Sequence, residues 1–171
     1  MESLKTPVIT FAARVDFIGG RTESGQVFMA PIAQHARATR PEERMNERDS
    51  FFPFLPDGKD HAILINKRHI AGVTISTEEY ERILGADAAL VGDRRRVVLE
   101  CADGRYEGVI TLQAPSQRRR TLDFVNGEEK FVTLKMADGY RLIPKEQIAL
   151  VAHCEDSTLR PPPPNDAQVA G

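Results

Sequence analysis

The sequence predicts a mainly β protein built from two tandem small five-stranded barrels with a short linking helix. Three observations lead to this prediction. Short runs of β-branched and apolar residues alternate with glycine-containing turns, as in small all-β domains. The segment 62–73 matches the segment 140–151 at six of twelve positions, including the whole pattern L-I-x-K-x-x-I-A-x-V. The length of 171 residues, with 41% hydrophobic residues, is sufficient for two small domains.

The second copy, residues 94–156, has the clearer pattern. Its Asp-Gly pairs at 103–104 and 138–139 mark hairpin turns, and a single helical turn is expected at 121–127, closed by Asn-Gly. Five short strands tied by tight turns are best closed as a barrel, because an open sheet of this size leaves both of its edges unpaired. The strands are predicted at 95–101, 106–113, 130–136, 140–143 and 147–153.

The first copy, residues 1–75, follows the same order less clearly. Its first two strands are expected at 8–18 and 26–32, and a third is expected in the apolar run Phe51–Pro56. Between them lies a long polar loop, 33–50, in which the proline at position 41 suits the first turn of a short helix. A loop of this length in a compact domain is usually functional or disordered.

The stretch 76–93 is predicted to link the two copies through a short helix. Ser76–Glu79 has the spacing of a capping box, in which the serine hydroxyl accepts from the amide of Glu79 and the glutamate side chain reaches back. The apolar residues that follow are expected to pack between the copies. Residues 157–171, with four consecutive prolines, are expected to form a flexible proline-rich tail.

Part of the second copy resembles a known layout. VVLECADGRYEGVITL at 97–112, followed by YRLIPKEQIALV at 140–151, is similar to the Sm/Hfq-like group and to SH3-like barrels. In that layout a bent strand pair precedes a hydrophobic strand, a short turn and a last hydrophobic strand. The chain also resembles an uncharacterised bacterial domain family built around L-(I/V)-x-K-x-x-I. Both resemblances imply a fold and no activity, and no RNA-contacting residue maps onto this sequence.

Composition and charge narrow the classes of function. Lys and Arg number 23 and Asp and Glu 25, which gives a net charge of −2 and excludes a uniformly basic nucleic-acid binder but not a local basic patch. No apolar run is long enough for a membrane span, and the first residues do not have the pattern of a secretory signal. Two cysteines are too few for a disulfide framework. These features predict a cytoplasmic protein.

Two arginine triplets are the first candidate binding residues. Their guanidinium groups could contact phosphate oxygens, since arginine pairs with such oxygens bidentately. The alternative is a solvated surface balanced by neighbouring carboxylates. A cyclic-dinucleotide site of the PilZ type is not predicted, because its second motif is missing. The candidate residues are Arg94, Arg95, Arg96, Arg118, Arg119 and Arg120.

Three further residues are weaker candidates. Phe52 belongs to the densest apolar cluster, which is interpreted mainly as core, although an outward-facing phenylalanine would anchor a partner. Lys67 and Lys145 occupy equivalent places in the two copies. They are interpreted as lysines whose stems cover the mouth of each barrel, and alternatively as a pair of equivalent binding sites.

The sequence predicts no catalytic residue, no metal site and no cofactor. Cys101, His153 and Cys154 would supply only three zinc ligands, without a C-x-x-C motif. The histidines at 61 and 69 have no serine in a G-x-S-x-G elbow to form a triad with, and no glycine-rich phosphate loop is present. An enzyme is therefore not predicted.

The function predicted from the sequence is a non-catalytic binding or adaptor module in a larger bacterial assembly. It would act through strand edges, the 33–50 loop and the tail. A protein partner is expected, and oligomerisation is left open. The alternative is an Sm-like RNA-binding protein that uses the arginine triplets. The 6% aromatic content, without tryptophan, favours the first interpretation because it supplies few stacking platforms.

Overall fold

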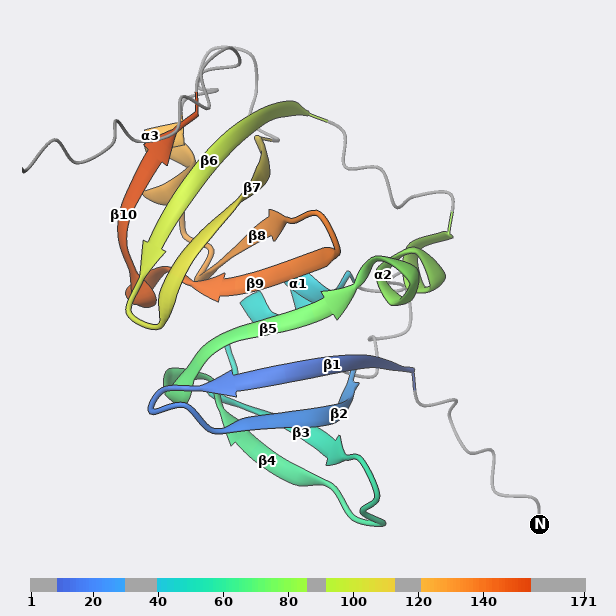
Figure 1. Ribbon diagram of the computed structural model, residues 1–171. Coiled ribbons are helices and arrows are strands. Elements are labelled where there is room, and N and C mark those ends of the chain that lie inside the picture. The colour runs from blue at the N-terminus through green and yellow to red at the C-terminus, as the bar shows by residue number, and fades with distance from the viewer. Residues whose placement is uncertain (1–8, 30–39, 86–91, 113–120, 155–171) are drawn as a thin grey trace, which may run out of the picture.

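The described residues form one antiparallel sheet of ten strands (Figure 1). The computed structural model describes residues 9–29, 40–85, 92–112 and 121–154. The strands lie side by side in the order β10-β6-β7-β8-β9-β5-β1-β2-β3-β4. Their bounds are β1 Thr10–Phe17, β2 Thr22–Phe28, β3 Phe51–Pro56, β4 Ile63–Asn66, β5 Ile70–Ser76, β6 Asp93–Cys101, β7 Gly104–Leu112, β8 Phe131–Lys135, β9 Gly139–Pro144 and β10 Ile148–His153.

The sheet contradicts the prediction of two closed small barrels, although the mainly β class is confirmed. β5, the last strand of the first half, pairs with β9 of the second half, with Val73 opposite Leu142 and Ile75 opposite Tyr140. Neither half closes on itself, since β4 and β10 are the two edges of the sheet. Two closed barrels would be required only if each copy had to hide its own sheet edges. Here one edge of each half is covered by the other half instead.

The two halves nevertheless share a strand order. The first half runs β5-β1-β2-β3-β4 and the second β10-β6-β7-β8-β9, so the last strand lies beside the first in each. A 3-10 turn precedes the last strand in both halves, at Lys67–His69 and Lys145–Gln147. These turns lie in the two matching sequence segments.

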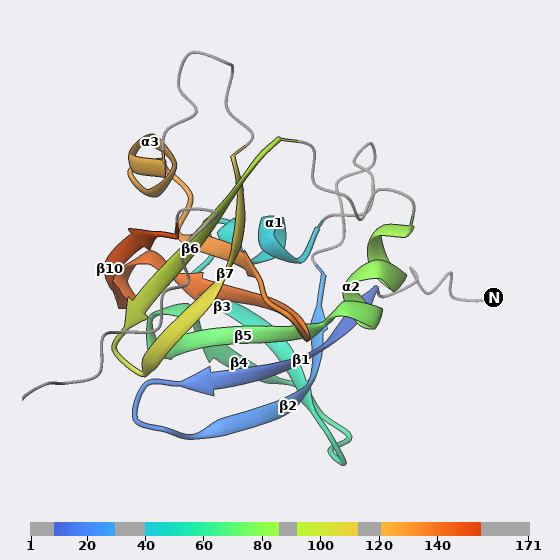
Figure 2. The ribbon, with the colours of Figure 1, turned by 45° about the horizontal axis from the view of Figure 1, so that its top comes forward.

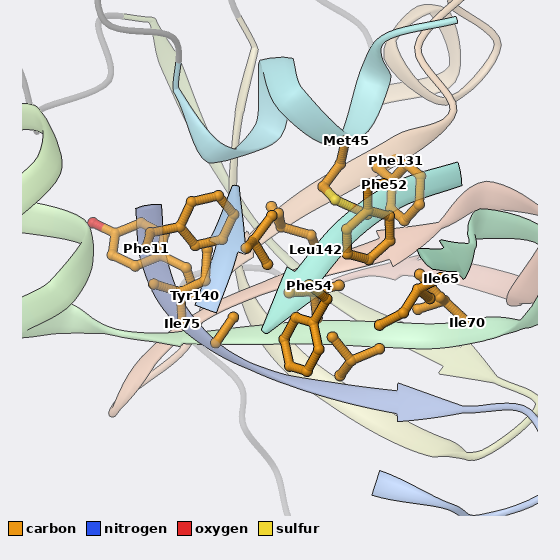
Figure 3. Packing of buried hydrophobic residues seen from close by; sticks show 14 of the residues in the cluster. Phe11, Met45, Phe52, Phe54, Ile65, Ile70, Ile75, Phe131, Tyr140 and Leu142 are labelled. Atoms are coloured by element: carbon orange, nitrogen blue, oxygen red, sulfur yellow. The ribbon is translucent and has the colours of Figure 1, made fainter. Parts of the chain in front are cut away.

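Two hydrophobic cores lie on opposite faces of the sheet. In β8 and β9, alternate side chains enter different cores, and all six residues of β9 are buried. Phe131, Tyr140 and Leu142 pack with the first half, as Figure 3 shows for the labelled residues of that core. The second core, on the other face, is built from Val97, Leu99, Ile110, Leu112, Val132, Leu134 and Ile143.

Among the residues that the structure describes, three short α-helices accompany the sheet (Figure 2). They are α1 (Pro41–Asn46), α2 (Thr77–Leu84) and α3 (Thr121–Val125). Helix α1 lies inside the stretch predicted as a long loop, at the proline that suits a helix start. No helix in the described ranges has the length and apolar character that crossing a membrane requires.

Helix α2 begins as the sequence predicts, but its capping box is incomplete. The Ser76 hydroxyl accepts from the amide of Glu79 at 3.2 Å. The Glu79 carboxylate instead accepts from the amide of Ala12 on β1, at 2.9 Å, and pairs with Arg82. This contact fixes α2 to the first half, and the buried Tyr80 of the helix stacks on Tyr140 of β9. The helix therefore contacts both halves of the sheet.

Candidate binding groove

The candidate site begins on the outer side of β6 and β7. Side chains of a strand alternate between its faces, so Arg94 and Arg96 lie on the side opposite Val97 of the second core. In the register of the two strands, Arg94 lies opposite Thr111 and Arg96 opposite Val109. Both arginines are exposed. The hairpin thus presents two guanidinium groups beside a threonine and a valine.

The other wall of the site comes from β8 and β9. The ladder between β7 and β8 has a single residue pair, Val109 with Lys135, and the β6–β7 ribbon rises steeply from the β8–β9 hairpin (Figure 1). A Cβ on Gly108 would lie 2.3 Å from the carbonyl oxygen of Lys135, so the strands approach closely at this one point. Beside it lies a groove of about 500 Å³. We call it the basic groove; its lining includes Arg94, Arg96, Glu107, Val109, Thr111, Thr133, Lys135, Met136 and Tyr140.

Positive charge predominates in the basic groove. Arg94, Arg96 and Lys135 are cations, and Glu107 is the one carboxylate among the described lining residues. The Lys135 ammonium lies 6.0 Å from the ring centroid of Tyr140. Burial raises the pKa of Tyr140, and the nearby Arg94 opposes this rise. The phenol therefore stays protonated at neutral pH and adds no negative charge to the groove.

A second groove, of about 400 Å³, adjoins the first. Thr111 and Thr133 line both grooves. The remaining lining of this second groove, which we call the acidic groove, comes from α1, α3 and the residues that follow α3. It contains five carboxylates and one cation, namely Glu42, Glu43, Asp123, Glu128, Glu129 and Arg40.

Helix α2 connects the two grooves through a stacked pair of tyrosines. Tyr140, from the basic groove, stacks on Tyr80 with 3.7 Å between ring centroids. The Tyr80 hydroxyl donates to Glu42 of the acidic groove at 3.0 Å. Burial raises the pKa of Glu42, although hydrogen bonds from its own backbone amide, Tyr80 and Arg40 oppose the rise. These contacts hold Glu42 in place at the rim of the acidic groove.

The arginine triplets contribute to the site only in part. Arg94 and Arg96 line the basic groove, whereas Arg95 lies on the other side of the strand, 3.7 Å from Asp93. Strand alternation explains this separation. The second triplet, Arg118–Arg120, lies outside the described residues.

Phe52 lies away from the groove. Its side chain is fully buried in the first core, and the exposed aromatic residue of this strand is its neighbour Phe51, at 49%. Phe52 contributes to packing and has no surface to offer a partner.

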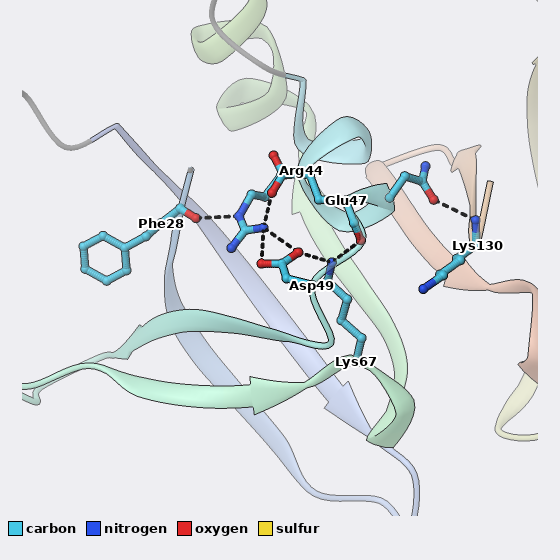
Figure 4. Close-up of polar contacts among 7 residues, drawn as sticks. Phe28, Arg44, Glu47, Asp49, Lys67 and Lys130 are labelled. Atoms are coloured by element: carbon cyan, nitrogen blue, oxygen red, sulfur yellow. Dashed lines mark hydrogen bonds and ion pairs between the residues drawn. The ribbon is translucent and has the colours of Figure 1, made fainter. Parts of the chain in front are cut away.

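Lys67 and Lys145 also lie outside the groove, and each holds the end of a helix. The Nζ of the buried Lys67 donates to the carbonyl of Glu47, directly after α1, and to Asp49 at 3.0 Å (Figure 4). Lys145 donates to the carbonyl oxygens of Phe124 and Gly127 at the end of α3. Lysines suit this place, since the carbonyls of the last helical turn lack partners within the helix. The shared pattern L-I-x-K-x-x-I thus has a structural use in both halves.

The cysteines and His153 do not assemble into a metal centre. No group of three or more His, Cys, Asp or Glu side chains in the described part of the chain could hold a metal ion. Burial, with a smaller effect of Asp103, raises the pKa of the Cys101 thiol to about 11, so it is protonated at neutral pH. The Cys154 amide donates to the carbonyl of Arg96, which extends the pairing of β10 with β6.

Sequence reasoning missed Lys135, Thr111, Thr133 and Tyr140. The alternation of side chains along the strand KFVTLKM places Lys135 and Thr133 on the same face. The sequence pattern could therefore have identified these two residues as neighbours. Nothing local shows that this face lies beside Arg94 and Arg96, because the approach of β7 to β8 is a tertiary feature.

Comparisons with known proteins do not assign the site. The chain matches no family model, no curated protein and no solved structure. Its function is therefore argued from the geometry of the two grooves.

Proposed function

We propose that the protein is a non-catalytic binding module that holds a carboxylate-bearing segment of a protein partner in the basic groove. The convergence of Arg94, Arg96 and Lys135 on one groove carries this proposal. Three cations around a partly apolar groove attract an anionic group. The guanidinium group of an arginine can donate two parallel hydrogen bonds to one carboxylate. The strand edges, the 33–50 loop and the tail remain further predicted contacts of the same module.

The alternative, single-stranded RNA, would use the same arginines. The acidic groove argues against it, since a polyphosphate strand that continues past Thr111 and Thr133 would meet Glu42, Glu43 and their neighbouring carboxylates, whereas a protein segment can carry its carboxylates at one end only. Tyr140 is also 5% exposed and stacked on Tyr80, so little of its ring remains for a base. A protein partner therefore suits the surroundings of the cations better.

The test measures fluorescence anisotropy at low salt with two labelled probes, a ten-residue peptide of four glutamates followed by six uncharged residues and a ten-nucleotide single-stranded RNA. We expect the peptide to bind, the single variants Arg94→Ala and Arg96→Ala each to weaken binding, and the double variant to weaken it at least about tenfold, as loss of two charge-assisted contacts implies. Arg95→Ala is the matched control, because it removes the same charge from the same strand outside the groove.

Two results would overturn the proposal. One is RNA that binds while the peptide does not, which would establish the alternative. The other is peptide binding that is absent at low salt, or that Arg95→Ala weakens as much as the loss of either groove arginine.

A further inference from the structure

The sheet is opened between two of its interior strands. β7 has nine residues and β8 five, yet their ladder ends after the pair Val109–Lys135. Had the antiparallel ladder continued, Thr111 would lie opposite Thr133. Instead these two threonines line both grooves. The Phe131 amide at the start of β8 donates to Oδ1 of Asn46. Around Thr111 and Thr133, by contrast, the two strands have no ladder partner on the sides that face each other, and an added strand can hydrogen-bond to such an edge.

The two ends of this opening carry opposite charges. The basic groove has Arg94, Arg96 and Lys135, and the acidic groove has five carboxylates against Arg40. The two grooves meet at the same pair of threonines, so a ligand that spans them passes from positive to negative surroundings. A ligand of uniform charge is favoured at one end only.

We propose that the opening between β7 and β8 binds an extended peptide segment whose acidic residues occupy the basic groove and whose basic residues occupy the acidic groove. This inference rests on the proposed function and specifies the segment that the module recognises. The segment lies as a strand beside Thr111 or Thr133, with its main chain bound to the edge that has no strand partner there. Side chains at its two ends supply the charge complementarity, which also fixes the direction in which it binds.

The experiment compares three decapeptides of the same length: one with an acidic half and a basic half, the same sequence reversed, and decaglutamate. We expect one of the two bipolar peptides to bind at least about tenfold more tightly than both its reversed form and decaglutamate. N-methylation of alternate amides along this peptide should weaken its binding, because the main-chain donors are lost.

Variants of the acidic groove give the second readout. Asp123→Asn/Glu128→Gln should weaken the preferred bipolar peptide and strengthen decaglutamate, since the repulsion at that end falls. The matched control is Glu100→Gln/Glu146→Gln, which removes two exposed carboxylates that line neither groove. Decaglutamate that binds as tightly as either bipolar peptide, with no response to the acidic-groove variant, would overturn this inference and leave the proposed function intact. No binding of any peptide would overturn both.

Discussion

Arg141 donates from Nη1 to Oδ2 of Asp16 at 2.6 Å, and this buried ion pair joins the two halves of the sheet. Arg141 lies on β9, where 2% of its side chain is exposed, and Asp16 lies on β1. The guanidinium also donates to Thr74 on β5 and to Asp103 in the β6–β7 turn, and it lies 4.4 Å from the ring centroid of Tyr106. Four elements thus converge on one arginine, so the junction is specified by charge as well as by strand pairing.

Removal of the Asp16 carboxylate should weaken this junction. We expect Asp16→Ala to lower the free energy of unfolding by about 3 kcal/mol, because a buried guanidinium loses one of its two carboxylate partners. Urea denaturation at pH 7 measures the change. Arg14→Ala is the control, since Arg14 also pairs with Asp16 but is exposed, and it should cost less than about 1 kcal/mol. Equal losses in the two variants would contradict the role given to Arg141.

Gly72 should be intolerant of a side chain because of the same arginine. A Cβ at this position would lie 2.6 Å from Cζ and Nη2 of Arg141, which is held by its hydrogen bonds and cannot move freely. Gly72→Ala is expected to cost about 1–3 kcal/mol as overpacking. In an Arg141→Leu background the penalty should shrink, and a double-mutant cycle in urea measures the difference. An identical penalty in both backgrounds would show that the clash lies elsewhere.

The pKa of Glu42 should respond to its tyrosine partner. Burial raises this pKa above 4.5 while the Tyr80 hydrogen bond lowers it, so Tyr80→Phe should raise it further. A raised folded-state pKa means that the stability contributed by protonated Glu42 is present below pH 4.5 and is lost as the pH rises through the folded-state pKa. Carbon-13 NMR titration of the Glu42 carboxyl group measures the shift. Tyr106→Phe, which removes a hydroxyl bonded to Asp103, should leave the titration unchanged.

The network around Asp49 should contribute to acid sensitivity. Burial raises the pKa of Asp49, but hydrogen bonds from Lys67 and Arg44 lower it more, so it lies below 3.8 (Figure 4). The corresponding stability is present above pH 3.8 and is lost as the pH falls through the folded-state pKa.

Asp49→Asn should therefore destabilise the protein at pH 7, by about 1 kcal/mol because the carboxylate is half exposed. The difference from the parent should narrow as the pH falls below 3.8. Urea unfolding from pH 7 to pH 2 gives both values, with the exposed Asp138→Asn as the control. A constant difference over this range would refute the linkage.

Local patterns predicted most of the individual elements, although the strand predicted to begin at residue 26 begins at Thr22. The Asp-Gly pair at 103–104 forms the turn between β6 and β7, as predicted. The predicted serine caps the start of α2, and the predicted proline is the first residue of α1. The candidate site could be predicted only in part. Arg94 and Arg96 were identifiable as cations on a strand, but the same triplet suggested that Arg95 would act with them. Only alternation combined with the known position of the second core separates the three.

The sequence alone therefore determined the β class, the places of most strands and turns, and the equivalence of Lys67 and Lys145, whose contacts with the ends of helices only the structure shows. The tertiary structure decided that β5 pairs with β9, that the two cores lie on opposite faces, and that β7 departs from β8 after one residue pair. The physical reason is that no local residue pattern specifies which two strands will pair along their edges. Every strand presents the same amides and carbonyls, so which edges meet, and which stay open to a ligand, depends on the packing of the whole chain.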